Sequence, residues 1–258
     1  YVISVIYANN INPLYGFFVA RAGLGASESM RSKLAEYNDP RLSRAFITKQ
    51  GTSGKEQAPG TADNAVYAPN GTPEQGTSKY GTSLFMYSIS APTLLLSYHE
   101  LKFLEAEALC RLERDAKSAL KDAVVAGLLN AENSFTISRK ELGKTLINAA
   151  SSITEAEAES YFDNTIEAKY TAEPLKTTMT QKYFALWGAS GEATESYNDV
   201  RRMKGLGENF IELKNPNSFP LRCPYGNSDT TTNAEVKAAY GNGQYVYSEN
   251  VWWAGGSR

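Results

Sequence analysis

The chain has 258 residues, enough to bury a core as one large domain or two small ones. Its 26 lysines and arginines nearly balance its 28 aspartates and glutamates, which leaves a net charge of −2 without any basic stripe. A phosphate backbone needs such a stripe, so we do not expect nucleic acid as a partner. No apolar stretch approaches the roughly 20 residues that cross a bilayer.

Residues 1–92 are predicted to form a loop-rich aromatic region with one short helix. A strand-like run, YVISVIYA, opens it without a signal-peptide pattern, so we interpret the chain as a mature or truncated piece. Ser27 is expected to cap the short helix, which carries Met30, Leu34 and Tyr37 on one face and ends before Pro40. Glycine-rich residues 48–83 are predicted to be loop.

Residues 93–204 are predicted to form a helical, repeat-like core. Asp115 is expected to cap a second helix whose apolar residues follow the spacing of one helical face. Only a few residues connect it to the helix before it, so the two should form an antiparallel, tetratricopeptide-like hairpin. The first helix is expected to bury a stripe made of Tyr98, Leu101, Leu104, Ala108 and Leu112.

A third helix is expected to begin at Thr154, which forms a capping box with Glu157. A further helix should begin at Pro174 and lead into the segment TQKYFALWGASGEATESYNDVRRMK, residues 180–204. This segment is predicted to form a helix, a glycine-containing turn and a second short helix. Of Arg201 and Arg202, which cannot face the same way, we expect one to pair with a carboxylate across the helix junction and the other to be solvated.

Residues 205–258 are predicted to be a loop-rich C-terminal region with a short helix at Ala234 to Tyr240. We interpret the three regions, 1–92, 93–204 and 205–258, as one continuous domain of a longer protein. Cys110 and Cys223 lack metal-site spacing and are expected to be free thiols.

The motifs that carry enzyme chemistry are mostly missing. A single histidine, His99, cannot build a three-histidine metal site or a triad with an alternative base, so neither a metal nor a cofactor is expected. The nucleophile-elbow and phosphate-loop motifs do not occur. A glycosidase with two carboxylates distant in sequence stays open, because such acids can meet in space.

Several segments together resemble the SusD/RagB family of surface lipoproteins. The residues that carry the resemblance occur in the family's order along nearly the whole chain. They are NDPRL at 38–42, YHELKFLEAEALCRL at 98–112, the segment from Gln181 to Arg202, FPLRCPYGNSDTTTNAEV at 219–236 and the closing Trp252 and Trp253. Two positions depart from the pattern: Gly226 replaces a proline, and residues 112–114 lack a glycine.

The resemblance implies a mostly α, SusD-like superhelix with a tetratricopeptide-like hairpin and long irregular loops. It also implies non-catalytic glycan binding at the outer-membrane surface and delivery to a SusC-like TonB-dependent porin. The membrane contact would be a lipid anchor alone, on a half of the family's length that this chain lacks. A helical-repeat scaffold that binds protein is the alternative, and a carbohydrate-active hydrolase comes last.

A sugar site needs an exposed aromatic platform with polar groups around it, because sugar rings have apolar C–H faces and a rim of hydroxyls. Tyr67 and Tyr80 lie in a polar loop that also holds Asn70. The sequence therefore predicts a glycan-binding platform at these residues, with Tyr15 and Phe18 as second choices. The competing interpretation is that the rings attach long loops to the helical body.

Overall fold

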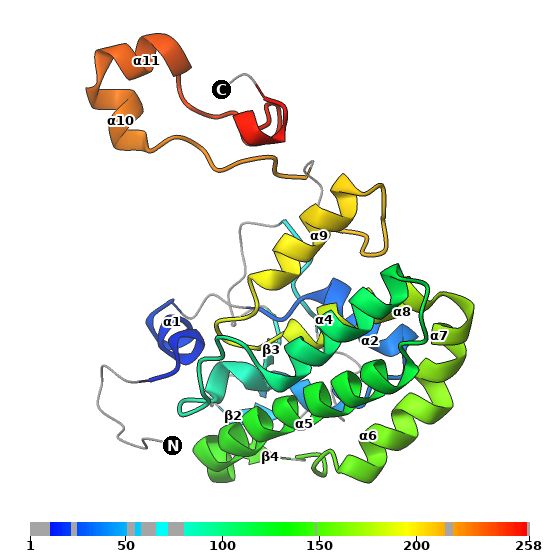
Figure 1. Cartoon of the computed structure of the whole chain (residues 1–258). Helices are drawn as coiled ribbons and strands as arrows, with labels where there is room; N and C mark the ends of the chain where they lie inside the picture. Colours follow the sequence, from blue (N-terminus) through cyan, green and yellow to red (C-terminus); the bar gives the residue numbers. More distant parts are fainter. Residues whose placement is uncertain are drawn as a thin grey trace. The chain divides into compact units, whose positions relative to one another are not determined.

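The computed structural model describes residues 11–21, 25–50, 55–57, 66–71, 80–147, 149–214 and 219–256. It is mostly helical, as predicted (Figure 1). The chain divides into two compact units, Tyr1–Glu212 and Leu213–Arg258, and the three-region organisation stays a prediction. Within the described ranges, no helix combines the length and the apolar character needed to span a membrane. The predicted strand at residues 1–8 lies outside them.

The first unit begins with short helices that support a tight turn. These are α1 (Pro13–Arg21), α2 (Glu28–Glu36) and α3 (Leu42–Ala45). The predicted cap is confirmed, because Ser27 Oγ accepts a hydrogen bond of 3.2 Å from the backbone N–H of Met30. Asn38 follows α2 with φ +49°, a left-handed conformation that asparagine tolerates better than most residues. This residue turns the chain into the Asp39–Arg41 segment.

Part of the region predicted as loop forms a small sheet instead. Its strands pair in the order β3-β1-β2-β4, with β1 antiparallel to β3 and β2, and β2 parallel to β4. Phe46 and Ile47 are fully buried on β1, which gives this edge of the core its apolar side chains. The elements are β1 (Phe46–Gln50), β2 (Lys55–Gln57), β3 (Thr82–Ser83), β4 (Leu146–Ile147) and the 3₁₀ turns η3 (Leu84–Tyr87) and η4 (Gly143–Thr145).

The predicted hairpin is formed by α4 (Tyr98–Arg111) and α5 (Lys117–Leu142), which lie side by side (Figure 1). Ser97 caps α4 through a 3.1 Å bond from the N–H of Glu100. The N-cap position of α5 is Ala116 and not Asp115 as predicted, although Asp115 Oδ1 accepts a hydrogen bond of 3.0 Å from the N–H of Lys117, the first residue of the helix. Small side chains along the hairpin, such as Ala106 and Ala119, are buried and let the helices approach closely.

The predicted buried stripe of α4 is wrong. The helix buries His99, Phe103 and Ala106 instead, which lie on the opposite face. The predicted apolar stripe lies on the other face of α4, where none of the described residues covers it. Tyr98, Leu101, Leu104 and Leu112 are therefore exposed, by 41% to 66%.

The core centres on α8 (Pro174–Leu186), which is buried on nearly every side. A Cβ built on Gly127 of α5 would lie 3.0 Å from the Cβ of Ala185, so this glycine permits the close approach of α5 to α8. Of the predicted capping box, the bond from the N–H of Glu157 to Thr154 Oγ1 forms at 3.2 Å, whereas the Glu157 carboxylate pairs with Arg44. The elements before α8 are α6 (Glu155–Tyr161), the π-helical turn η5 (Phe162–Ile166) and α7 (Glu167–Ala172).

The predicted helix, turn and helix of residues 180–204 are confirmed. Gly191 lies in the turn at φ +96°, and a Cβ there would lie 2.0 Å from the carbonyl oxygen of Leu94, so only glycine fits. The turn is held against the segment before α4, because the N–H of Leu94 donates to the carbonyl of Ser190 at 2.7 Å. Helix α9 (Glu195–Gly205) follows and buries Val200 and Met203.

The second unit contains α10 (Asn227–Thr232), α11 (Ala234–Tyr240) and the 3₁₀ turn η6 (Trp252–Ala254). The short helix predicted at Ala234 to Tyr240 is confirmed. The rings of Tyr225 and Tyr240 stack with centroids 4.5 Å apart, and the Arg222 guanidinium lies 4.5 Å from the Tyr225 centroid. Both cysteines are free thiols, as predicted.

Candidate functional site

A buried ion pair of Asp39 and Arg41 lies beside a polar cleft between the 38–44 segment and α6, and of the pair Asp39 lines the cleft. The Arg41 Nη2 lies 2.6 Å from Asp39 Oδ2, and its Nε donates to Asp39 Oδ1 at 2.8 Å. Tyr161 Oη donates to the same carboxylate at 3.3 Å, and Arg41 Nη1 donates to the carbonyl of Phe184 on α8 at 2.7 Å. Burial alone would lower the pKa of Arg41, but the Asp39 carboxylate outweighs it and raises that pKa.

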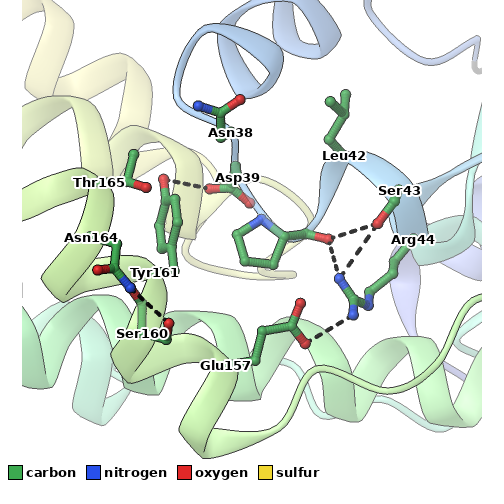
Figure 2. Close-up of a pocket in the computed structure, with 11 residues that line it drawn as sticks. Asn38, Asp39, Leu42, Ser43, Arg44, Glu157, Ser160, Tyr161, Asn164 and Thr165 are labelled. Atoms are coloured by element: carbon green, nitrogen blue, oxygen red, sulfur yellow. Dashed lines mark hydrogen bonds and ion pairs between the residues drawn. The ribbon is translucent and has the colours of Figure 1, made fainter.

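A second arginine closes one end of this cleft. Arg44 Nη2 lies 2.9 Å from Glu157 Oε2, Nη1 donates to the Pro40 carbonyl at 2.9 Å, and Nε donates to the Ser151 carbonyl at 2.7 Å. Glu157 thus uses its backbone N–H for the cap of α6 and its carboxylate to join α6 to the 38–44 segment. Figure 2 shows the bonds of Arg44 to Glu157 and to the Pro40 carbonyl along one side of the cleft.

The cleft has a volume of about 490 Å³ and is open to solvent. Asn38 and Ser43 line one wall, and Ser160 and Asn164 line the other, with all four side chains exposed (Figure 2). The amide nitrogen of Asn164 donates to the carbonyl and the hydroxyl of Ser160, both at 2.9 Å. Since π-helical turns often occur at functional sites, the η5 turn on this wall agrees with a binding role.

A second cleft, of about 460 Å³, lies between α4, α8 and α9 and is lined by paired charges. Glu107 accepts hydrogen bonds from Arg202 and from Arg111 Nε, the latter at 2.7 Å, and Arg111 Nη1 lies 2.8 Å from Glu208 Oε1. Burial would raise the pKa of Glu107, but the two arginines outweigh it and lower that pKa. Arg202 thus pairs with a carboxylate, as predicted, but that carboxylate belongs to Glu107 of α4 and does not lie across the junction of α8 and α9. The Arg201 guanidinium lies 5.6 Å from the centroid of the Tyr197 ring.

Behind this second cleft lies a cluster of buried ionisable groups. Glu192 accepts a hydrogen bond from the N–H of Ser97, and its Oε2 lies 3.6 Å from His99 Nε2. Burial lowers the pKa of His99, although the Glu192 carboxylate acts in the other direction. Burial together with the hydrogen bond and the charge of Glu192 raises the pKa of Glu100 to about 7. Glu100 and Glu192 thus behave as a close acid pair.

The structure contradicts the exposure on which the predicted aromatic platform depends. Tyr67 is 5% exposed and Tyr80 is 8% exposed, and Phe18 is equally buried. The ring of Tyr67 packs edge-on against Phe46 with centroids 5.2 Å apart, which agrees with the competing interpretation for this residue. Contact of Tyr67, Tyr80 or Phe18 with a glycan stays a prediction. A mixture of polar and aromatic residues in a loop sequence does not reveal whether an aromatic ring is exposed to solvent or buried against the core.

The remaining predicted residues are more open but do not lie in the polar cleft. Asn70 Oδ1 accepts a hydrogen bond of 2.8 Å from the hydroxyl of Ser27, at the N-terminus of α2, whereas the cleft begins beyond its C-terminus. Tyr15 is half-buried on α1. Contact of either residue with a glycan stays a prediction. The Asn64, Gln75 and Lys79 side chains around the predicted platform lie outside the described residues.

The sequence does not predict the cleft as a site, although one of its walls is the NDPRL motif at residues 38–42. The NDPRL motif was recognised, but the hydroxyl and amide side chains of Ser160 and Asn164 carry no pattern of their own. Among the residues that the structure describes, no three His, Cys, Asp or Glu side chains gather closely enough to hold a metal ion. The walls of the cleft offer hydroxyl and amide groups that can donate and accept hydrogen bonds.

Comparison with known proteins gives the family. The model of a SusD-like family described as "Starch-binding associating with outer membrane" matches residues 2–225. A crystal structure of a SusD/RagB family protein from Bacteroides thetaiotaomicron has 65% identity and a TM-score of 0.87, with 98% of this chain and 54% of that chain covered. No curated protein matches.

A second solved structure, from Bacteroides vulgatus, is described as a candidate outer-membrane protein connected with nutrient binding. It has 22% identity and a TM-score of 0.57, and the match covers 87% of this chain and 50% of that one. This likeness is one of fold alone. The chain spans about half the length of both solved relatives. From the family model and the 65% identical structure, we conclude that the chain belongs to the SusD/RagB family.

Proposed function

We propose that the protein binds a glycan at the outer-membrane surface without cleaving it and passes it to a SusC-like, TonB-dependent porin. The observation that carries this proposal is the match of residues 2–225 to a family described as starch-binding and associated with the outer membrane. A lipid anchor outside these 258 residues would hold the protein at the surface. The polar cleft supports a binding role, since it offers several hydrogen-bonding side chains to a ligand.

The burial of the acid pair supports binding without catalysis. A glycosidase needs two carboxyl groups that flank a bound sugar. Glu100 and Glu192 lie close together, but Glu192 is 1% exposed and is engaged by Ser97 and His99. A glycosidic bond therefore has no access to both carboxylates at once.

Purified protein should bind at least one oligosaccharide on a glycan array and should leave that oligosaccharide intact. Titration calorimetry would give the affinity, and mass analysis after prolonged incubation would detect shortened products. A blank array would contradict glycan binding, and products that accumulate in proportion to protein concentration would show a hydrolase instead. Boiled protein is the control for contaminating enzymes.

Delivery to a transporter is tested separately. Affinity capture from membranes in mild detergent should recover a TonB-dependent porin together with this protein. Capture under the same conditions with an unrelated outer-membrane lipoprotein is the control. Recovery of no porin would argue against the delivery step and would leave glycan binding as it stands.

A protein-binding scaffold is the second candidate, and the exposed apolar face of α4 favours it. Leu101→Lys with Leu104→Lys should abolish capture of a protein partner that docks on this face, because two charges there would have to be buried. Glycan affinity should stay unchanged. Val19→Lys, an exposed apolar position on α1, is the matched control. Loss of a partner in both variants, or in neither, would count against α4 as the docking face.

A further inference from the structure

The cleft described above carries an inference about the class of sugar. We infer that the cleft between the 38–44 segment and α6 is a glycan subsite and that it takes an uncharged sugar. The inference rests on the proposed function and adds the place of binding and the chemistry of the ligand.

The cations of the cleft are already neutralised by the protein. Each of the three guanidinium nitrogens of Arg41 donates to Asp39 or to the Phe184 carbonyl, and the side chains of this pair are almost fully buried. Each nitrogen of Arg44 donates to Glu157 or to a backbone carbonyl. The side chain of Arg41 is 3% exposed and that of Arg44 is 9% exposed, and each pairs with a carboxylate of the protein, so neither guanidinium is open to a carboxylate or a sulfate of a ligand.

The accessible charge in the cleft is negative. The Glu157 side chain is 38% exposed, whereas that of its partner Arg44 is 9% exposed, so the carboxylate faces solvent more than the cation does. An anionic sugar in the cleft would meet this carboxylate at short range, and repulsion between like charges would oppose binding. Vicinal hydroxyls of a neutral sugar can instead donate to the carboxylate, and bonds to an ionised acceptor are the stronger kind.

The two walls supply groups that suit hydroxyls. Asn38 and Asn164 carry amides, and Ser43 and Ser160 carry hydroxyls, so each wall can both donate and accept (Figure 2). A sugar hydroxyl also does both, which is why mixed donors and acceptors on facing walls recognise it. The bonds from Asn164 to Ser160 hold that side chain in place before any ligand arrives.

The cleft also has apolar surface and a suitable size. Pro40 and Leu42 lie between the polar groups and are half-buried, so they can cover the C–H face of a sugar ring in place of the predicted aromatic platform. Its volume of about 490 Å³ falls within the range of about 300–1,000 Å³ that is common for small-molecule sites. One or two sugar units of a longer chain would fit there.

The test compares neutral and anionic hexasaccharides on the purified protein by titration calorimetry. The neutral probes are maltohexaose, xylohexaose and mannohexaose, and the anionic probes are hexagalacturonate and a heparin hexasaccharide. We expect at least one neutral probe to bind, with an affinity that changes little between about 50 and about 500 mM salt, because screening acts on charges. Neither anionic probe should bind. Binding of an anionic probe alone would overturn the sugar class.

Two variants on opposite walls test the location. Asn164→Ala and Asn38→Gly each remove one amide, and glycine keeps the left-handed conformation at residue 38. Each should weaken the neutral probe by about 5- to 10-fold, the usual effect of one lost hydrogen bond. Asn133→Ala, on an exposed position of α5 away from the cleft, is the matched control, and thermal melting checks that all three variants fold.

The outcomes separate this inference from the proposed function. If a neutral probe binds the unmodified protein and both cleft variants bind it equally well, the site is wrong while glycan binding stands. If none of the five probes binds, both the sugar class and the subsite are rejected, and the array experiment decides whether the protein binds any glycan. Weakening in both cleft variants but not in Asn133→Ala supports the site.

Discussion

Replacement of Arg41 by methionine should lower the free energy of unfolding by about 3–5 kcal/mol, the usual cost of removing one partner from a buried ion pair. Methionine fills much of the same volume but leaves the Asp39 carboxylate without its cation in a site closed to water. The Phe184 carbonyl on α8 also loses its donor. Urea unfolding followed by circular dichroism would measure the difference.

The control for this variant is an ion pair of similar geometry on the surface. Lys176 lies 2.8 Å from Glu173 and both side chains are about half exposed, so Lys176→Met should cost less than about 1 kcal/mol. A loss below about 1 kcal/mol for Arg41→Met as well would contradict the view that the Asp39–Arg41 pair holds the 38–44 segment to α8. The cleft would then have no rigid base.

Glu100→Gln should raise the melting temperature at pH 8 and change it little at pH 4. Burial and the nearby Glu192 raise the pKa of Glu100 to about 7 in the folded protein, from an ordinary value of 4.5. Between these two values the folded state holds a proton that the unfolded state has lost. The stabilisation is therefore complete below about pH 4.5 and is lost as the pH rises through about 7.

Glutamine mimics the protonated acid at every pH, so the variant should escape this loss. The groups that face Glu100 are Glu192, Lys182 and Glu195, and none of them is altered by the substitution. Each kcal/mol regained should raise the melting temperature by roughly 2–4 °C in a protein of this size. Glu105→Gln, on the exposed side of α4, is the control. Equal melting shifts at pH 4 and pH 8 would contradict a proton held by the acid pair.

Features that depend on neighbouring residues were predicted well. The caps at Ser27 and Thr154 need only a side chain and an N–H three residues later, and both bonds form. The turn at Gly191 and the start at Pro174 likewise follow from the conformations that glycine and proline allow. Arg202 pairs with a carboxylate, as predicted, although the sequence does not identify Glu107 of α4 as the partner.

Features that depend on distant residues were not predictable in the same way. An apolar stripe predicts that a helix face is buried. On α4, however, Leu101 and Leu104 of the stripe are exposed, and a different face of the helix packs against the core. The polar loop around Tyr67 predicts an exposed ring, yet the ring packs edge-on against Phe46, which lies 21 residues earlier on β1. The cleft joins residues 38–44 to residues 157–165, and no local pattern encodes that meeting.

The ion pairs around Glu107 have a mechanical consequence. Arg202 of α9 pairs with Glu107 of α4, and Arg111 of α4 pairs with both Glu107 and Glu208. Glu208 lies only four residues before Glu212, where the first unit ends. Tension applied along the chain from the second unit reaches Glu208 and Arg202 before it reaches the apolar core. The side chains of Arg111 and Arg202 are partly exposed, so salt screens their pairs with Glu107 and Glu208, whereas buried apolar contacts carry no charge to screen. The force needed to detach α9 should therefore fall with ionic strength, while the force that unravels α5 and α8 stays constant.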